Sequence, residues 1–140
     1  MANTMHVELV SPERVVFSGE ATQVITRTLG GGEIAFLAGH APFLGALDES
    51  HTRITLADGT QLDAAVHGGF VQVGGNKVSI LSDVAELADD IDRARALAAM
   101  ERAEATLRHA HDAEAEAALS RAHARLNATG GVRDTQAGAH

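Results

Sequence analysis

The hydrophobic pattern of this chain changes its period once, between Leu81 and Arg102. Before this segment apolar residues alternate with polar ones, which is the period of a half-buried β-strand. After it they recur every three or four positions, which is the period of an amphipathic helix. Asp89, Asp90 and Asp92 stand at the change, and an aspartate can cap the free N–H groups of a first helical turn. The pattern therefore predicts a β-domain over residues 1–84 with helices after it.

Short alternating segments, separated by turn residues, fill the N-terminal part of the chain. Asp58-Gly59 and Gly74-Gly75-Asn76 are typical of the loops of β-hairpins, and Ser18-Gly19 is expected to be a further turn. Many short strands at close spacing indicate an antiparallel β-sandwich or barrel. The strands expected from the pattern are residues 6–10, 14–17, 21–29, 33–37, 53–56, 61–66, 70–73 and 77–81.

The helical part, residues 85–128, is expected to be an antiparallel hairpin. One helix is predicted from about Ile91 to His109 and a second from about Ala113 to Asn127, with a connection too short for any other arrangement. Both contact stripes consist mainly of alanine, which buries little apolar area. Such a hairpin is marginal alone and needs the β-domain, a ligand or a partner, so we expect it to be a mobile element. Residues 129–140 are glycine-rich and aperiodic, which predicts a disordered end.

The expected hairpin carries four arginines at helical spacing: Arg95, Arg102, Arg121 and Arg125. Folding the hairpin near residue 111 with equal rise on both sides places Arg102 level with Arg121, and Arg125 about one turn from Arg95. Glu86 and Asp92 then lie near the lower end of this group. Two interpretations remain open. The arginines are solvated if the helices are rotated apart, or they form a site for a polyanion such as the phosphate chain of a nucleotide.

The composition limits the partners of the chain. Its 11 Lys and Arg residues stand against 19 Asp and Glu residues, which gives a formal net charge of −8. An acidic surface repels phosphate backbones and anionic lipid, so we expect no nucleic-acid partner and no direct insertion into lipid. The absence of cysteine, of an apolar run of about 18 residues and of a signal-like N-terminus predicts a cytosolic chain, or one attached to a cytosolic assembly.

Candidate catalytic and metal-binding groups are isolated in the sequence. His40 has no serine, cysteine or paired carboxylate beside it, so a structural or contact role is favoured. Gly30-Gly31-Gly32 lacks the Lys-Ser/Thr pair of a phosphate-binding P-loop. His109 and His111 are two positions apart and would point to different sides of a helix. The sequence thus predicts a non-catalytic chain with no metal site.

Several motifs occur in a specific order over nearly the whole chain, from about residue 5 to residue 126. They are Gly39-His40-Ala41-Pro42, His67-Gly68-Gly69-Phe70, Asn76-Lys77-Val78 and Asp83-Val84-Ala85-Glu86, followed by the helical hairpin. This ordered set resembles the epsilon subunit of bacterial F-type ATP synthase. The resemblance implies a non-catalytic subunit at the cytoplasmic face of the cell membrane, attached peripherally, with a β-sandwich that contacts the gamma subunit and the c-ring. It also implies that the hairpin either folds on the sandwich or extends along gamma towards the alpha/beta head and inhibits ATP hydrolysis.

The resemblance also implies two sets of site residues. The loop with Gly-His-Ala-Pro faces the rotor base in this family, which implies subunit contacts by Glu33, His40, Ala41 and Pro42 and an exposed loop over residues 33–44. Ala35 and Ala38 depart from the glycine and proline that are common in that loop.

Some members of the family bind ATP on the folded hairpin through an Ile/Leu-Asp-x-x-Arg-Ala motif, which is intact here at residues 91–96. ATP is thus implied as a regulatory ligand, with Mg²⁺ compatible but not required. The implied ATP-binding residues are Glu86, Ile91, Asp92, Arg95, Ala96, Arg102, Arg121 and Arg125. A free-standing nucleotide-binding or adaptor module without a rotor role remains the alternative.

Overall fold

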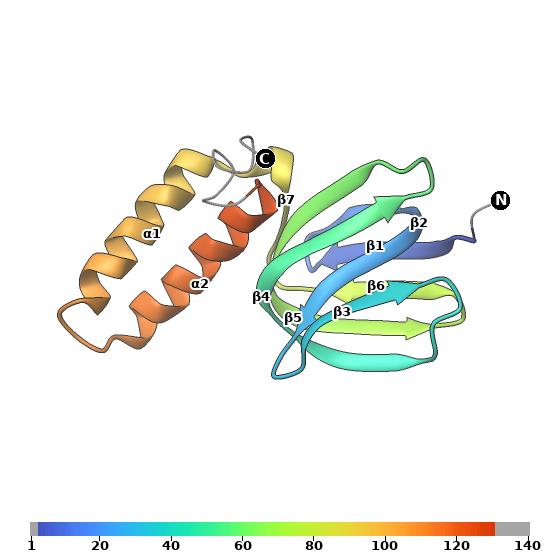
Figure 1. Cartoon of the computed structure of the whole chain (residues 1–140), viewed down its shortest axis with the longest axis horizontal. Coiled ribbons are helices and arrows are strands. Elements are labelled where there is room, and N and C mark those ends of the chain that lie inside the picture. The colour runs from blue at the N-terminus through green and yellow to red at the C-terminus, as the bar shows by residue number, and fades with distance from the viewer. Residues whose placement is uncertain (1–2, 131–140) are drawn as a thin grey trace, which may run out of the picture.

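A β-sandwich and a helical hairpin lie side by side in the structure (Figure 1). The structure, a computed structural model, describes residues 3–130 of the 140-residue chain. The strands are β1 (Met5–Ser11), β2 (Arg14–Thr28), β3 (Gly32–Leu37), β4 (Phe43–Leu56), β5 (Gln61–Gly74), β6 (Lys77–Leu81) and β7 (Ala85–Leu87). A 3₁₀ turn (Ala88–Asp90) then leads into α1 (Arg93–Leu107) and α2 (Ala113–Ala128). The predicted order of a sandwich followed by two helices is confirmed.

The sheet closes on itself in the order β1-β6-β5-β4-β2-β3, because β1 also pairs with β2, and β7 is added beside β5. All pairs among the described strands are antiparallel except β1 with β6, which run parallel in the register Val7 to Val78 and Leu9 to Ile80. The prediction of an exclusively antiparallel sandwich is corrected at this one pair. No hairpin joins β1 to β6, so no turn fixes their relative direction.

The interior of the sandwich is built from aliphatic side chains that face inward at every second position. Val7, Leu9, Val78 and Ile80 are fully buried where β1 meets β6, as the period-two pattern predicts. Two buried threonines form an exception, and their hydroxyl oxygens, Oγ1 of Thr26 and Oγ1 of Thr52, are hydrogen-bonded at 2.8 Å. This pair satisfies both hydroxyl groups inside an apolar core.

Three strands are longer than the pattern predicts. The expected turn at Ser18-Gly19 is wrong, because β2 continues through both residues and pairs with β1. β4 begins at Phe43, where no strand was expected, and β5 continues through the glycines at 68 and 69. The sheet also extends to Leu87 through β7, three residues beyond the expected domain boundary at residue 84.

The hairpin docks on the sandwich through α2, which packs on β4 and β5, while α1 packs on α2 (Figure 1). The apolar cluster of this contact has small side chains: Ala65 of β5 is buried against Ala124 and Ala128 of α2, with Ile91 packed beside them. Such a contact buries little apolar area for its length.

The ends of the two helices are fixed by polar contacts. Asp112 caps α2 by accepting from the N–H of Ala115 at 3.0 Å. Arg93 at the start of α1 donates to Oγ1 of Thr129, just after α2, at 2.9 Å. Among the described residues, neither helix is long and apolar enough to cross a lipid bilayer. The predicted disordered end lies, from residue 131 on, outside the described residues.

Candidate functional site

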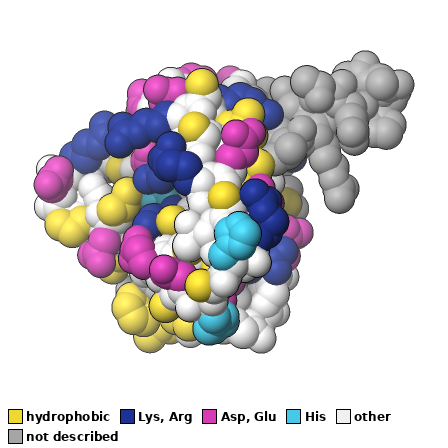
Figure 2. Space-filling view, turned by 90° about the vertical axis from the view of Figure 1, so that its left-hand side faces the viewer, with side chains coloured by type: hydrophobic (Ala, Val, Ile, Leu, Met, Phe, Trp, Pro, Cys, Tyr) yellow, Lys and Arg dark blue, Asp and Glu magenta, His cyan; other side chains and the backbone are white. Residues whose placement is uncertain are grey.

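A cavity of about 320 Å³ lies where β7, α1 and α2 meet. Its walls carry three arginines, three carboxylates and two alanines: Glu86, Asp90, Asp92, Arg95, Ala96, Ala99, Arg102 and Arg125. The hairpin end of the molecule shows the same distribution, with a band of Lys and Arg side chains bordered by acidic ones (Figure 2). The sandwich contributes Glu86, and the other walls belong to the hairpin and the segment that leads into it.

The first turns of α1 provide one wall of this cavity. Arg95, Ala99 and Arg102 are spaced by four and three residues, which places their side chains along one face of the helix. Ala96 is buried beside them at 3% exposure, and its small side chain leaves the space that the arginines border. Among the described residues, neither the Arg95 nor the Arg102 guanidinium group has a carboxylate partner. Both groups are therefore available to an anion.

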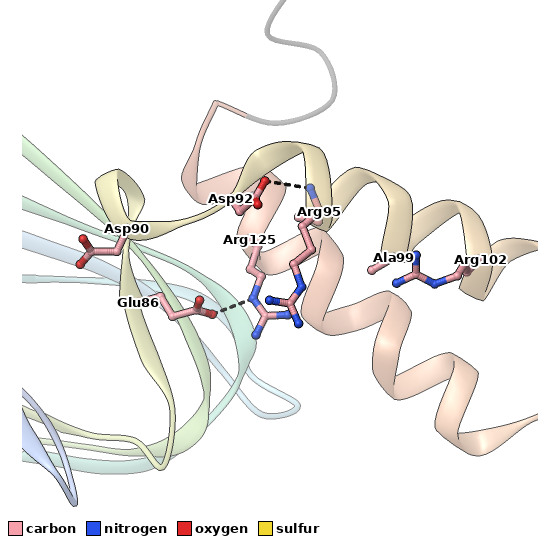
Figure 3. A pocket seen from close by; sticks show the side chains of 8 residues that line it. Glu86, Asp90, Asp92, Arg95, Ala99, Arg102 and Arg125 are labelled. Carbon is pink, nitrogen blue, oxygen red and sulfur yellow. Dashed lines mark hydrogen bonds and ion pairs between the residues drawn. The ribbon is translucent and has the colours of Figure 1, made fainter.

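Arg125 comes from α2, and its guanidinium group lies beside that of Arg95 (Figure 3). Its Nε donates to Oε1 of Glu86 at 2.7 Å. The same oxygen accepts from Nε2 of His67 at 2.9 Å. Burial by itself would raise the pKa of Glu86, but the hydrogen bonds from Arg125 and His67 and the positive charge of Arg125 outweigh it. The pKa of this carboxyl group therefore lies below its usual range.

The two aspartates of the cavity have different surroundings. Asp92 is the N-cap of α1, and its Oδ1 accepts from the backbone N–H of Arg95 at 3.0 Å. It thus holds the first turn of the helix, and through it the position of Arg95. The carboxylate of Asp90 points away from the guanidinium groups (Figure 3). Asp90 and Ala99 were not predicted as site residues, although helical spacing places Ala99 between Arg95 and Arg102.

Two of the predicted ATP-binding residues lie outside the cavity walls. Ile91 packs against the alanine contact between hairpin and sandwich. Arg121 points elsewhere, because its Nη2 donates to Oε1 of Glu114 at 2.9 Å, two turns earlier on α2. The predicted gathering of four arginines is thus realised for three of them. The other six predicted residues line one space.

The residues predicted to contact other subunits fall into two groups. His40, Ala41 and Pro42 lie between β3 and β4, at the end of the sandwich away from the hairpin (Figure 1). Ala41 and Pro42 are exposed, and the ring of His40 packs edge-on against Phe36 at 4.9 Å between centroids. Glu33 lies at the other end of β3.

Glu33 lines a second cavity, of about 400 Å³, between the sandwich and α2. The expected exposure of residues 33–44 holds for most of the segment, including Leu44 at 71%, but not for Phe36, which is fully buried. The two groups of predicted contact residues therefore face different surroundings.

The arrangement in the first cavity suits a ligand with several negative charges. Guanidinium groups bind phosphate oxygens through paired N–H donors, and three of them converge on this space. Within the described part of the chain, no group of three or more His, Cys, Asp or Glu side chains is arranged to hold a metal ion. The arginines are thus the groups that would neutralise an anion here.

Comparisons with known proteins agree with this architecture. Residues 4–88 match the family model described as ATP synthase, Delta/Epsilon chain, beta-sandwich domain, and residues 89–130 match the one described as ATP synthase, Delta/Epsilon chain, long alpha-helix domain. The sandwich and the hairpin together thus define a delta/epsilon-type chain.

Relatives that match over most of their length carry a more specific name. The ATP synthase epsilon chain of Streptomyces avermitilis is 50% identical over 105 residues, which cover 75% of this chain and 84% of the relative. That of Streptomyces coelicolor is 45% identical over 131 residues, which cover 94% of this chain and 99% of the relative. The chain therefore belongs to the epsilon subunit family of ATP synthase.

A solved structure shows the same fold at low sequence identity. A chain in the cryo-EM structure of the Euglena gracilis mitochondrial ATP synthase, OSCP/F1/c-ring in rotational state 1, superposes with a TM-score of 0.76 at 21% identity. The match covers 98% of this chain and 82% of that one.

Proposed function

We propose that this chain is the epsilon subunit of the central stalk in a bacterial ATP synthase, and that ATP bound in the arginine cavity keeps its hairpin docked. In this role the sandwich contacts the gamma subunit and the c-ring at the cytoplasmic face of the membrane. The hairpin, when it extends, follows gamma towards the alpha/beta head and inhibits ATP hydrolysis. Family membership supports the stalk role, and the cavity supports the regulatory one.

One observation carries the regulatory part of the proposal: the cavity has walls from three elements that meet only when the hairpin is docked. Arg95 and Arg102 come from α1, Arg125 from α2 and Glu86 from β7 of the sandwich. A ligand that uses all of them binds the docked form and not the extended one. By linkage, it stabilises the docked form by RT ln(1 + [L]/Kd), and it opposes inhibition to the same extent.

The hairpin needs this stabilisation because its own contacts are weak. The apolar cluster between hairpin and sandwich is built from alanines with Ile91 beside them, and three arginines border one space at the junction. All three belong to the hairpin, so their mutual repulsion disfavours the pairing of α1 with α2 around this space when no anion is bound. A phosphate chain removes the repulsion, and each charge-assisted hydrogen bond contributes about 1.5–3 kcal/mol.

Calorimetric titration of the isolated chain with ATP tests the ligand, and hydrogen exchange of α2 amides during the same titration tests its effect on docking. We expect saturable heat at millimolar or lower ATP, with slower exchange of α2 amides as the site fills. Absence of heat at millimolar ATP would mean that the arginines are only solvated. Heat without slower exchange would separate binding from the conformational role.

The stalk role has its own test, because the chain contains no cysteine and a single introduced one reports on one position. We expect a cysteine at His40 to cross-link to the c-ring or gamma in the assembled synthase. A cysteine at Glu33 lies at the other end of β3 and tests whether the contact extends that far. Failure at both positions in a coupled synthase would contradict the docking role.

A further inference from the structure

Arg125 is bonded on the sandwich side to Glu86, and Glu86 is bonded in turn to a buried histidine. Glu86 Oε1 accepts from Arg125 Nε at 2.7 Å and from His67 Nε2 at 2.9 Å. The His67 side chain is 5% exposed, whereas those of Glu86 and Arg125 are 27% and 30% exposed. The histidine is thus the most enclosed member of this chain of three groups.

His67 is held in place by the sheet itself. Its backbone N–H donates to the carbonyl of Val84 at 3.0 Å, and it pairs with Glu49 across β4 and β5. It lies two residues after Ala65, which packs against α2, so the period of the strand places both side chains on the hairpin-facing side. The ring position is therefore set by the rigid part of the molecule.

The hydrogen bond between His67 and Glu86 has a defined direction. An ionised carboxylate can only accept, so Nε2 carries the proton in this contact. The other ring nitrogen, Nδ1, lies 3.5 Å from Oε2 of Glu49, and both of these atoms are buried without a hydrogen-bond partner. The two ring nitrogens thus differ: Nε2 forms a hydrogen bond on the side of the hairpin, and Nδ1 forms none on the side of β4.

We propose that His67 is a positioning residue of the arginine cavity: its Nε2 fixes Glu86, and Glu86 fixes the Arg125 guanidinium group for the anion and for hairpin docking. The part of the inference that concerns the anion rests on the proposed ATP site, and the part that concerns docking does not. Because Glu86 belongs to the sandwich and Arg125 to α2, the same hydrogen bonds join the hairpin to the sandwich. His67 itself does not border the cavity, and it acts through Glu86.

Two substitutions test the roles of the two ring nitrogens of His67 separately. The amide nitrogen of glutamine can take the place of Nε2, so H67Q keeps a donor for Glu86. The shorter asparagine places its amide near Nδ1, so H67N loses the donor for Glu86 while it keeps a polar side chain. A matched control exists on β4, where His51 Nε2 and Arg53 Nε share Oδ1 of Asp63 at 2.6 and 2.9 Å. H51N breaks the same kind of histidine–carboxylate–arginine contact, but one whose three members all belong to β4 and β5 of the sandwich, although His51 also borders the second cavity beside α2.

The experiment measures ATP affinity by calorimetry and α2 amide exchange in the ligand-free full-length chain. We expect H67N to lower ATP affinity about tenfold and to speed the exchange of α2, while H67Q and H51N stay within about twofold of the wild type. In an R125A background H67N should cause no further loss in either measurement, because the coupling passes through Arg125.

Each outcome decides the inference. Equal effects of H67N and H67Q, or a full additional loss in the R125A background, would show that His67 acts only as a packing residue. If the wild type binds no ATP, the proposed ATP site fails, and the ligand-free exchange of α2 then decides the role of His67 alone. If ATP binds and H67N behaves as the wild type in both measurements, the ATP site stands and the positioning role is wrong.

Discussion

The backbone N–H of Gly39 donates a 3.1 Å hydrogen bond to Oδ1 of Asn76, a residue 37 positions later in the chain. Asn76 has a φ of 60° in the turn between β5 and β6, and its Nδ2 donates to the carbonyl of Thr4 at 2.7 Å. One side chain therefore joins the turn, the N-terminal segment and the Gly-His-Ala-Pro loop. A neighbouring hairpin thus helps to set the shape of that loop.

Replacement of Asn76 by glycine should remove its side-chain hydrogen bonds while it keeps the backbone conformation of the turn. Glycine adopts a positive φ without strain, so the turn persists while both hydrogen bonds are lost. We expect the free energy of unfolding to fall by about 1–2 kcal/mol and the Gly39 amide to exchange faster. Asn76→Asp keeps the acceptor for Gly39 and loses the donor to Thr4, so in this variant the Gly39 amide should remain protected. Continued protection in the glycine variant would contradict the role of the side chain.

Gly69 lies where β5 passes closest to the backbone of the segment after β6. Its φ is +112°, and a Cβ there would fall on the carbonyl oxygen of Leu81 and 2.8 Å from Cα of Ser82. Gly69→Ala should therefore lower the free energy of unfolding by about 3 kcal/mol or more, as measured by urea denaturation. Gly74→Ala is the matched control, because a Cβ there meets no atom within 4 Å. A loss of similar size at both glycines would contradict this steric explanation.

Arginines that border the cavity should contribute to ATP binding, and an arginine away from it should not. Arg95→Ala and Arg125→Ala each remove a guanidinium group that borders the cavity, and we expect either to weaken ATP binding about tenfold or more. Arg108→Ala, at the exposed end of α1, is the charge control and should leave affinity unchanged. Calorimetry of the three variants checks the order. Equal losses at all three positions would indicate a general effect of net charge.

Arg121 provides a separate prediction, because its side chain is bonded to Glu114 outside the cavity. Arg121→Ala should therefore weaken ATP binding less than Arg125→Ala does. Calorimetry checks this comparison, with Glu114→Gln as the companion variant that releases Arg121 without removing its charge. A loss equal to that of Arg125→Ala would mean that Arg121 leaves Glu114 when the ligand binds.

Docking of the hairpin should weaken in acid. The pKa of Glu86 is lowered in the docked form by its hydrogen bonds with Arg125 and His67. When the hairpin leaves, Glu86 loses Arg125, which belongs to α2, whereas His67 stays beside it in the sandwich. The docked form therefore has its full advantage above the ordinary pKa of a glutamate, about 4.3, and loses it as pH falls through the lowered value. Hydrogen exchange of α2 amides between pH 6 and pH 3, about the range of that titration, measures the effect after correction for intrinsic exchange. Glu86→Gln should remove this pH dependence, and a persistent one would place its origin elsewhere.

The hairpin could be predicted in detail because its determinants are local. Helical rise and the short connection bring Arg95 and Arg125 together, as the structure has them. The same reasoning placed Arg121 in the cavity, but its side chain forms an ion pair with Glu114, two turns away on the same helix. Spacing gives the position of a side chain around a helix and leaves open which of two neighbours it will bind.

The sandwich was predicted as a fold but less well as a set of strands. Residues 43–52 of β4 were missed because polar residues occupy buried positions there, as at Ser50, and at Thr52, which is hydrogen-bonded to Thr26 of the neighbouring strand β2. The parallel pairing of β1 with β6 depends on two segments that are far apart in the chain, and no local pattern reports on such a pairing. His67 gave no sequence signal as a partner of Glu86, because only the sheet register brings the two together.

The contact formed by the methyl groups of Ala65, Ala124 and Ala128 affects how fast the hairpin can dissociate from the sandwich. Alanines have no rotamers to change and present a smooth surface, so most of this contact can slide apart without side chains having to disengage. The barrier to departure then lies chiefly in the rupture of the ion pair between Glu86 and Arg125, which added salt screens. The residence time of the hairpin on the sandwich should thus shorten as ionic strength rises, because an ion pair limits its dissociation.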